Sequence, residues 1–363
     1  MKRPPTPKFE NDSDLTEDPF APAQAEDEDL WFLPGPVDDA ERDPFAPPLP
    51  RGEGRLLYDV DAWVSAEATL AQPLAELAFL AGRLVERLRR APGMVDRLAM
   101  GEAVELSWLA GDRVSADSLA LWHHLCIGSA REDAQALGRA DWALRRLIAG
   151  PGPLEDLRTF LGRHNPAEGE AGSPLSHRIA DWQDAMAEVR GLHPITQAAF
   201  GFSLWPLAEP SQGSALEDHA PAQLLESAVA ATRIAALIGG QGMRFLPLAL
   251  DGGSALRLGG PVQARLSRWI LGADQAARKA LVQLDQVEDW VVRAEAATAT
   301  MSGRTRQHLI AALLANPVLS APMAEALTKS SRAAVQRNMT RFEDLGLIRE
   351  ITGQGRFRFW AVN

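Results

Sequence analysis

Residues 320–347 read SAPMAEALTKSSRAAVQRNMTRFEDLGL, and this stretch decides how the C-terminal part of the chain folds. Ser320 can cap a short helix, because a serine side chain accepts a hydrogen bond from a free amide of the first turn. Pro322 is tolerated in that first turn, where its missing N–H has no helical partner to lose. Helical spacing then predicts that Met323 and Leu327 point inward.

A second helix is expected directly after a turn made by Thr328-Lys329-Ser330. Val335, Met339 and Phe342 recur at spacings of four and three, which places them on one inward face of a helix. Gly346 can supply the positive φ that ends this helix. Two helices joined by such a short turn are typical of a helix-turn-helix.

The flanking residues are expected to complete a winged helix-turn-helix over residues 302–363. A helix over roughly residues 304–316 precedes the motif and stops at Pro317. Two strands, residues 348–352 and 356–362, follow it across a glycine-containing turn.

The second of these strands predicts a wing with a cationic outer face. Side chains alternate between the two faces of a strand. Phe357 and Phe359 therefore share one face, and Arg356 and Arg358 share the other.

The same segment is basic within an acidic protein. Residues 303–363 hold nine Lys and Arg against four Asp and Glu, a net charge of +5, whereas the whole chain has a net charge of −11. The remainder must therefore sum to −16. This asymmetry favours a polyanion partner for the C-terminal segment alone.

The partner predicted from this pattern is double-stranded DNA. In a helix-turn-helix the start of the recognition helix meets base edges in the major groove, and neighbouring residues bind phosphates. Arginine can bond guanine, and glutamine can bond adenine, through two hydrogen bonds each. The predicted DNA-binding residues are Lys329, Ser330, Ser331, Arg332, Gln336, Arg337, Arg341, Arg356 and Arg358.

The end of the chain also carries a family resemblance. Residues 343–353, followed by Arg356-Phe357-Arg358-Phe359, are similar to the ending of helix-turn-helix modules appended to Fic-type proteins. The chain as a whole resembles a bacterial family, often plasmid-borne, with a helical body and a C-terminal helix-turn-helix. The resemblance implies DNA binding without naming an operator.

A Fic-type signature would contain His-Pro-Phe, an acid, Gly-Asn-Gly and Arg. The best match is His193-Pro194-Ile195-Thr196-Gln197, in which Gln197 replaces the acid, and the residues that would handle phosphates are missing. We therefore expect this segment to be a core helix. A degenerate Fic-like transferase remains one alternative function.

Residues 56–301 predict an all-helical body, so the expected fold is mainly α: a helical bundle followed by the winged helix-turn-helix. Apolar residues between Leu74 and Leu88 recur at three and four residues, and a second helix is expected to start near Met94. The apolar stripe of residues 281–294 is the candidate seam of a homodimer, or else intramolecular core.

Residues 1–55 form a separate acidic tail with a net charge of −8 and eleven of the 25 prolines. Such a composition predicts disorder, because little apolar surface is available to offset the entropy of ordering. The sequence Asp-Pro-Phe-Ala-Pro occurs twice, at residues 18–22 and 43–47. This repeated motif could dock on a protein partner, which would make the chain a protein-interaction adaptor. Alternatively, it is a duplicated fragment of a tail rich in acidic residues and proline.

Other classes of protein are disfavoured. The single cysteine, Cys126, allows no intramolecular disulfide and fits the cytoplasm. Arg233 interrupts the best apolar run, so we expect no membrane span. His123 and His124 are consecutive and diverge by about 100° on a helix, which makes a shared metal ion a minor alternative. We predict a cytoplasmic DNA-binding transcriptional regulator that is not an enzyme and has no cofactor or metal.

Overall fold

A computed structural model describes residues 59–91, 93–125, 133–162, 174–205, 216–257, 259–353 and 358–363. The acidic tail and its two Asp-Pro-Phe-Ala-Pro motifs lie outside the described residues, so the adaptor hypothesis stays a prediction. Residues 55–363 form one compact unit, and everything below concerns that unit.

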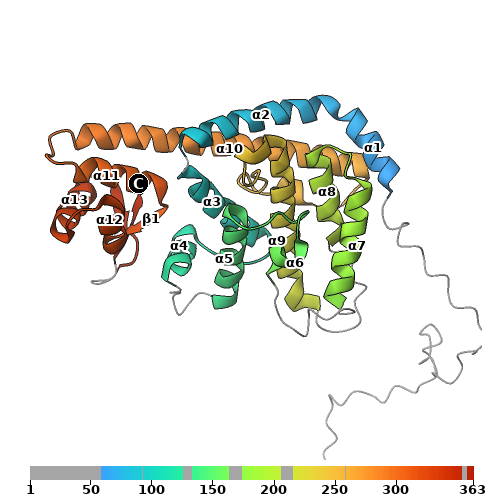
Figure 1. Cartoon of the computed structure of the whole chain (residues 1–363), viewed down its shortest axis with the longest axis horizontal. Coiled ribbons are helices and arrows are strands. Elements are labelled where there is room, and N and C mark those ends of the chain that lie inside the picture. Colours follow the sequence, from blue (N-terminus) through green and yellow to red (C-terminus); the bar gives the residue numbers. More distant parts are fainter. Residues whose placement is uncertain are drawn as a thin grey trace, which may run out of the picture. The chain divides into compact units, whose positions relative to one another are not determined.

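Helices build the body, as the sequence predicts (Figure 1). They are α1 (Val60–Thr69), α2 (Ala71–Arg90), α3 (Met94–Leu109), α4 (Ala116–Leu125), α5 (Ala134–Ile148), α6 (Leu157–Leu161), α7 (Pro174–Glu188), α8 (Pro194–Leu204), α9 (Leu216–Ala235) and α10 (Val262–Ala297), with short 3-10 helices η4 (Ala236–Gly242) and η5 (Ser254–Leu256). The predicted apolar face of α2 is buried, and α3 begins at Met94 as expected. Helical periodicity therefore located these elements correctly.

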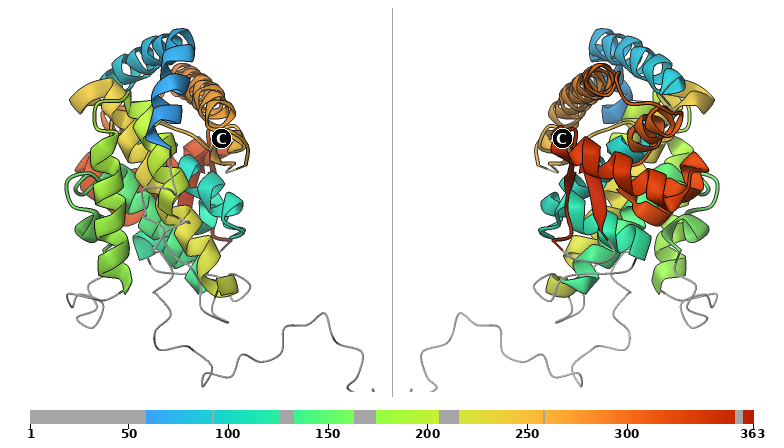
Figure 2. Two further views of the ribbon diagram at one scale, coloured as in Figure 1. Left: turned by 90° about the vertical axis from the view of Figure 1, so that its right-hand side faces the viewer. Right: turned by 90° about the vertical axis from the view of Figure 1, so that its left-hand side faces the viewer.

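The long helix α10 packs along α2, and Figure 2 shows the two helices side by side. Leu284 and Ala294, which belong to the candidate dimer seam, are only 2% and 0% exposed. Of the two interpretations of the stripe at residues 281–294, the intramolecular core is confirmed. Leu281, Val287 and Val291 of the same stripe pack against the core but stay partly exposed, so a dimer contact through them stays a prediction.

Helix α9 is long and apolar enough to cross a bilayer by length and composition, over the window Ala222–Gly240. However, 61% of that window is buried inside the protein. Arg233, in the same helix, donates hydrogen bonds to the carbonyl oxygens of Ala149 and Gly150 at the end of α5. The helix thus has the contacts of a core helix.

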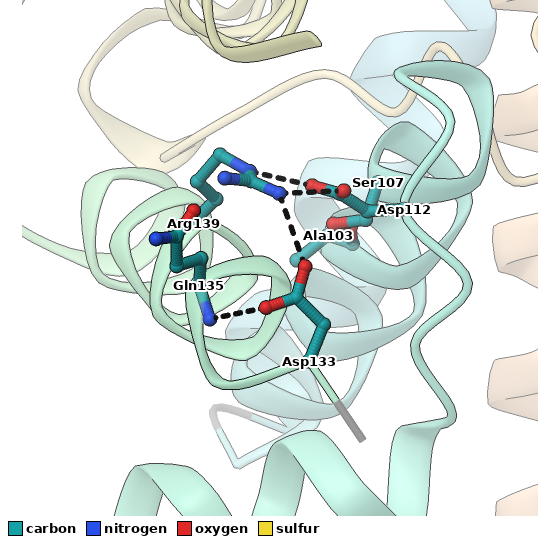
Figure 3. A network of polar contacts seen from close by, with 6 residues as sticks. All are labelled: Ala103, Ser107, Asp112, Asp133, Gln135 and Arg139. Carbon is teal, nitrogen blue, oxygen red and sulfur yellow. Dashed lines mark hydrogen bonds and ion pairs between the residues drawn. The ribbon is translucent and has the colours of Figure 1, made fainter. Parts of the chain in front are cut away.

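A polar network holds the start of α5 against the turn after α3 (Figure 3). Arg139 donates two hydrogen bonds of 2.7 Å to the carboxylate of Asp112. Asp133 lies 3.8 Å from the same guanidinium and caps α5 by accepting from the Gln135 amide. The side chain of Asp112 is 9% exposed, so this two-point ion pair is geometrically well defined. The network fixes the turn that leads into α4.

Glu102 of α3 is fully buried and ties this helix to the segment before η5. Its carboxylate accepts hydrogen bonds from the backbone amides of Leu248, Ala249 and Leu250, at 2.8 to 3.2 Å. Burial raises the pKa of Glu102 to about 7, against the lowering effect of these hydrogen bonds.

The C-terminal segment contains three helices and a small antiparallel sheet. The helices are α11 (Thr305–Ala315), α12 (Ala321–Thr328) and α13 (Arg332–Asp344), and the strands are β1 (Val318–Ser320), β2 (Ile348–Glu350) and β3 (Phe359–Val362). The strand order is β1-β3-β2, with Val318 opposite Ala361 and Ile348 opposite Val362. The sequence predicted the helices and β2 and β3, but not β1.

One predicted core position in α12 is wrong. Leu327 is 53% exposed, whereas Ala324 and Thr328 are buried. The small Ala324 and the Thr328 hydroxyl, which bonds the Ala324 carbonyl at 2.7 Å, occupy the inner face instead. Small residues there allow α12 to lie close to α11.

The body and the C-terminal segment share buried contacts. Trp290 of α10 belongs to the core of the C-terminal segment and donates a hydrogen bond of 2.8 Å to the Leu347 carbonyl. Val318, Phe359 and Ala361 of the sheet belong to the core of the body. The small sheet therefore contacts both cores.

Arg97 of α3 adds a polar clasp at the end of α11. It donates to the carbonyl oxygens of Leu313, Leu314 (3.0 Å) and Asn316 (2.7 Å). Nearby, a Cβ added to Gly93 would lie 2.2 Å from Ala315 Cα, so only glycine fits this close approach.

Candidate nucleic-acid interface

The α12–α13 pair is built by two serine caps and one left-handed residue. The Ser320 hydroxyl accepts from the Met323 amide at 3.3 Å, and the Ser331 hydroxyl accepts from the Ala334 amide at 3.4 Å. Between the helices, Lys329 ends α12 with φ 50° and ψ 38°. That residue supplies the sharp turn which redirects the chain into α13.

Helix α13 has one buried face and one exposed polar face. Val335, Met339 and Phe342 are at most 1% exposed, as predicted. The predicted DNA-binding residues at the cap of this helix and along it are all exposed: Ser331, Arg332, Gln336, Arg337 and Arg341. The helix therefore presents a polar and cationic surface to solvent.

The arginine at the start of α13 is only weakly engaged within the protein. Arg332 Nε lies 3.9 Å from Glu325 Oε1, and its side chain is 75% exposed. An ion pair this long and exposed contributes little. The Arg332 guanidinium can therefore exchange this contact for a DNA base or phosphate at low cost.

Ser330 has a structural role in addition to its predicted one. Its hydroxyl bonds the Thr305 hydroxyl at 3.0 Å and the Thr328 carbonyl at 3.3 Å. These contacts join the turn to the first residue of α11. The start of α11 thus lies beside the start of α13, which the sequence did not predict.

The wing is described in part. Arg358 is exposed and Phe359 is buried, as alternation predicts. Arg356 and Phe357 lie outside the described residues. At the base of the wing the Glu350 carboxylate accepts from the amides of Thr352 and Gly353. Burial by itself would raise the pKa of Glu350, but these hydrogen bonds lower it overall.

Another cation of this segment faces the body. Arg349 of β2 pairs with Asp117 at the start of α4, at 3.0 Å. The sequence counted Arg349 in the basic excess but could not place it, because Asp117 is 232 residues away along the chain. One positive charge of the wing is thereby matched by the body.

The candidate sites in the body have structural roles in the described residues. His193 caps α8, with its Nδ1 accepting from the Ile195 amide at 3.2 Å, and burial lowers its pKa. The rest of α8 is buried, so its prediction as a core helix is confirmed.

The second candidate site in the body is the histidine pair. His123 Nδ1 lies 2.6 Å from Asp141 Oδ1, and Cys126 lies outside the described residues. In the part of the chain that the structure describes, no group of three His, Cys, Asp or Glu is arranged to hold a metal ion.

Comparison with known proteins supports the interpretation of the C-terminal segment. Residues 307–362 match a family model described as an HTH DNA binding domain. No curated protein matches the chain. The chain is therefore a mainly helical protein that carries a helix-turn-helix DNA-binding domain at its C-terminal end.

Proposed function

We propose that this protein is a cytoplasmic transcriptional regulator that binds double-stranded DNA through its C-terminal winged helix-turn-helix. The observation that carries the proposal is the exposure of Arg332, Gln336 and Arg337 on α13, a helix held in place by the buried side chains of Val335, Met339 and Phe342. In helix-turn-helix proteins these positions meet base edges.

Each residue has a distinct expected role. Arg332 and Arg337 donate to guanine and Gln336 pairs with adenine. Lys329, Ser330, Ser331 and Arg341 bind phosphates beside them, with Arg356 and Arg358 adding contacts from the wing. The proposal includes a homodimer on a two-fold symmetric site, as is usual for this motif, and assigns no chemistry to the body.

The test is a binding titration of the full-length protein on selected genomic fragments at 50 and 200 mM salt. Replacing Arg332 and Arg337 by Ala should each lower affinity for the selected fragment by about 1–3 kcal/mol and relax the base preference. Arg341→Ala should weaken binding to all sequences and reduce the salt slope by about 0.9.

Arg83→Ala is the matched control, because Arg83 is an exposed arginine of α2 in the body. It should bind as the wild type does. Affinity that stays within twofold of wild type in the Arg332→Ala/Arg337→Ala double variant would contradict the proposal.

A further inference from the structure

A groove runs between α11 and α12 and ends at the turn before α13. It has a volume of about 790 Å³, and its wall on the α13 side consists of Thr328, Lys329 and Ser330. The hydroxyl bond between Thr305 and Ser330 closes the same end, at 3.0 Å. The groove is thus continuous with the surface from which α13 projects.

The ionisable side chains that line this groove are all basic: Arg304, His308 and Lys329. Arg304 and Lys329 are exposed and form no ion pair with any described residue. His308 Nδ1 donates to the Thr328 carbonyl at 3.3 Å, which holds the ring against the turn. One sign of charge lines the groove, so it favours an anionic occupant.

The floor of the groove is made of small side chains. Ala311, Ala312 and Ala315 line it along α11, and Leu327 lines it from α12. Alanines keep the groove open and allow a bulky chain to approach the helix backbone.

We propose that this groove holds the sugar-phosphate backbone of the DNA strand next to the bases read by α13, with Arg304 and Lys329 on its phosphates. This inference rests on the proposed function. DNA is favoured over an acidic peptide because the groove meets the start of α13, where the strand would already lie. The contact adds α11 to the DNA-binding surface and makes Arg304, outside the matched family segment, a binding residue.

The experiment measures DNA affinity against salt for four forms of the full-length protein: wild type, Arg304→Ala, Lys329→Asn and Arg83→Ala. Asparagine is chosen at position 329 because it tolerates the left-handed conformation while removing the charge. The first two variants should each lower the salt slope by about 0.9, so that the affinity loss between 50 and 200 mM salt becomes about 3.5-fold smaller than in the wild type. Arg83→Ala should keep the wild-type slope.

A steric variant tests the groove without changing charge. Ala311→Trp fills the floor at an exposed position of α11 and should lower affinity while the protein keeps its thermal midpoint. Phosphate ethylation interference should lose its signal at the same flanking phosphates in Ala311→Trp and Arg304→Ala.

The outcomes separate this inference from the proposed function. Wild-type slopes in Arg304→Ala and Lys329→Asn, with full affinity in Ala311→Trp, would overturn the groove inference while the Arg332→Ala/Arg337→Ala variant still tests base reading. Binding of a polyglutamate peptide is measured with the same variants. If Arg304→Ala and Lys329→Asn lose peptide binding but bind DNA as the wild type does, the groove would be assigned to an acidic peptide instead. A wild-type protein that binds no DNA at all would overturn both.

Discussion

Replacing Arg97 by Met should uncouple the C-terminal segment from the body. Arg97 is a partly buried residue of α3, and its guanidinium donates to three carbonyls at the end of α11. These carbonyls have no partner within a helix, so the arginine acts as a cap supplied by another element. Burial lowers the pKa of Arg97 to about 10, so it remains charged at neutral pH.

The expected cost follows from these contacts. A hydrogen bond from a charged donor contributes about 1.5–3 kcal/mol. Water can replace part of the three bonds, because the site is only partly buried, and Met keeps most of the packing of the arginine stem. We therefore expect a loss of about 2–4 kcal/mol in the coupling between α3 and α11.

Differential scanning calorimetry of the full-length protein is the assay. The wild type should unfold residues 59–363 together, whereas Arg97→Met should show an earlier transition for the C-terminal segment. For a segment of this size the shift is on the order of 10 °C. Hydrogen exchange should speed up in the last turn of α11.

The control is Arg90→Met, because Arg90 is 72% exposed and, among the described residues, pairs with Glu86 on its own helix. Such pairs contribute about 0.3–0.5 kcal/mol. The reasoning fails if Arg97→Met unfolds in one transition within about 1 °C of Arg90→Met, since the clasp would then contribute nothing beyond a surface ion pair.

Two further predictions concern pH and backbone strain. Burial raises the pKa of Glu102 from 4.5 to about 7, so the folded protein binds this proton more tightly than the unfolded chain does. The contribution of Glu102 to the free energy of unfolding should therefore be largest below pH 4.5. It should fall by about 3 kcal/mol between pH 4 and pH 8. Glu102→Gln should flatten that slope in urea titrations, and an unchanged slope would rule Glu102 out as its source. Lys329→Gly should stabilise the protein by roughly 1 kcal/mol in the same titrations, because glycine adopts the observed φ of 50° without strain. It should also weaken DNA binding through the lost charge, so equal stability and equal affinity would contradict both roles of Lys329.

Local signals made the helix-turn-helix predictable. The inward residues of α13 follow from helical spacing alone, and Gly346, at φ 67°, ends this segment as expected. Ser320 caps α12 because its side chain can reach an amide three residues away. Each of these features depends on residues within about one turn of each other, so a single sequence contains the information.

Contacts between distant residues were not predictable in this way. Strand β1 has only three residues and exists because it pairs with β3, about 40 residues later. Arg97 meets the end of α11 216 to 219 residues further along the chain. Leu327 fits the spacing of an inward residue, but the close approach of α11 over Ala324 turns it outward. Topology decides such positions, and helical periodicity carries no information about it.

Contacts between the body and the C-terminal segment limit how far α13 can move relative to the body. Trp290 of α10 is bonded to Leu347, directly after α13, and Arg97 of α3 holds the end of α11. Turning α11 and α13 relative to the body would therefore break a buried hydrogen bond to α10 and partly buried ones to α3, at a cost of several kcal/mol. A segment joined by a free linker would have no such cost. An event in the body that moves α3 or α10 must consequently move the exposed face of α13 with it, because packed elements shift as units and do not deform continuously.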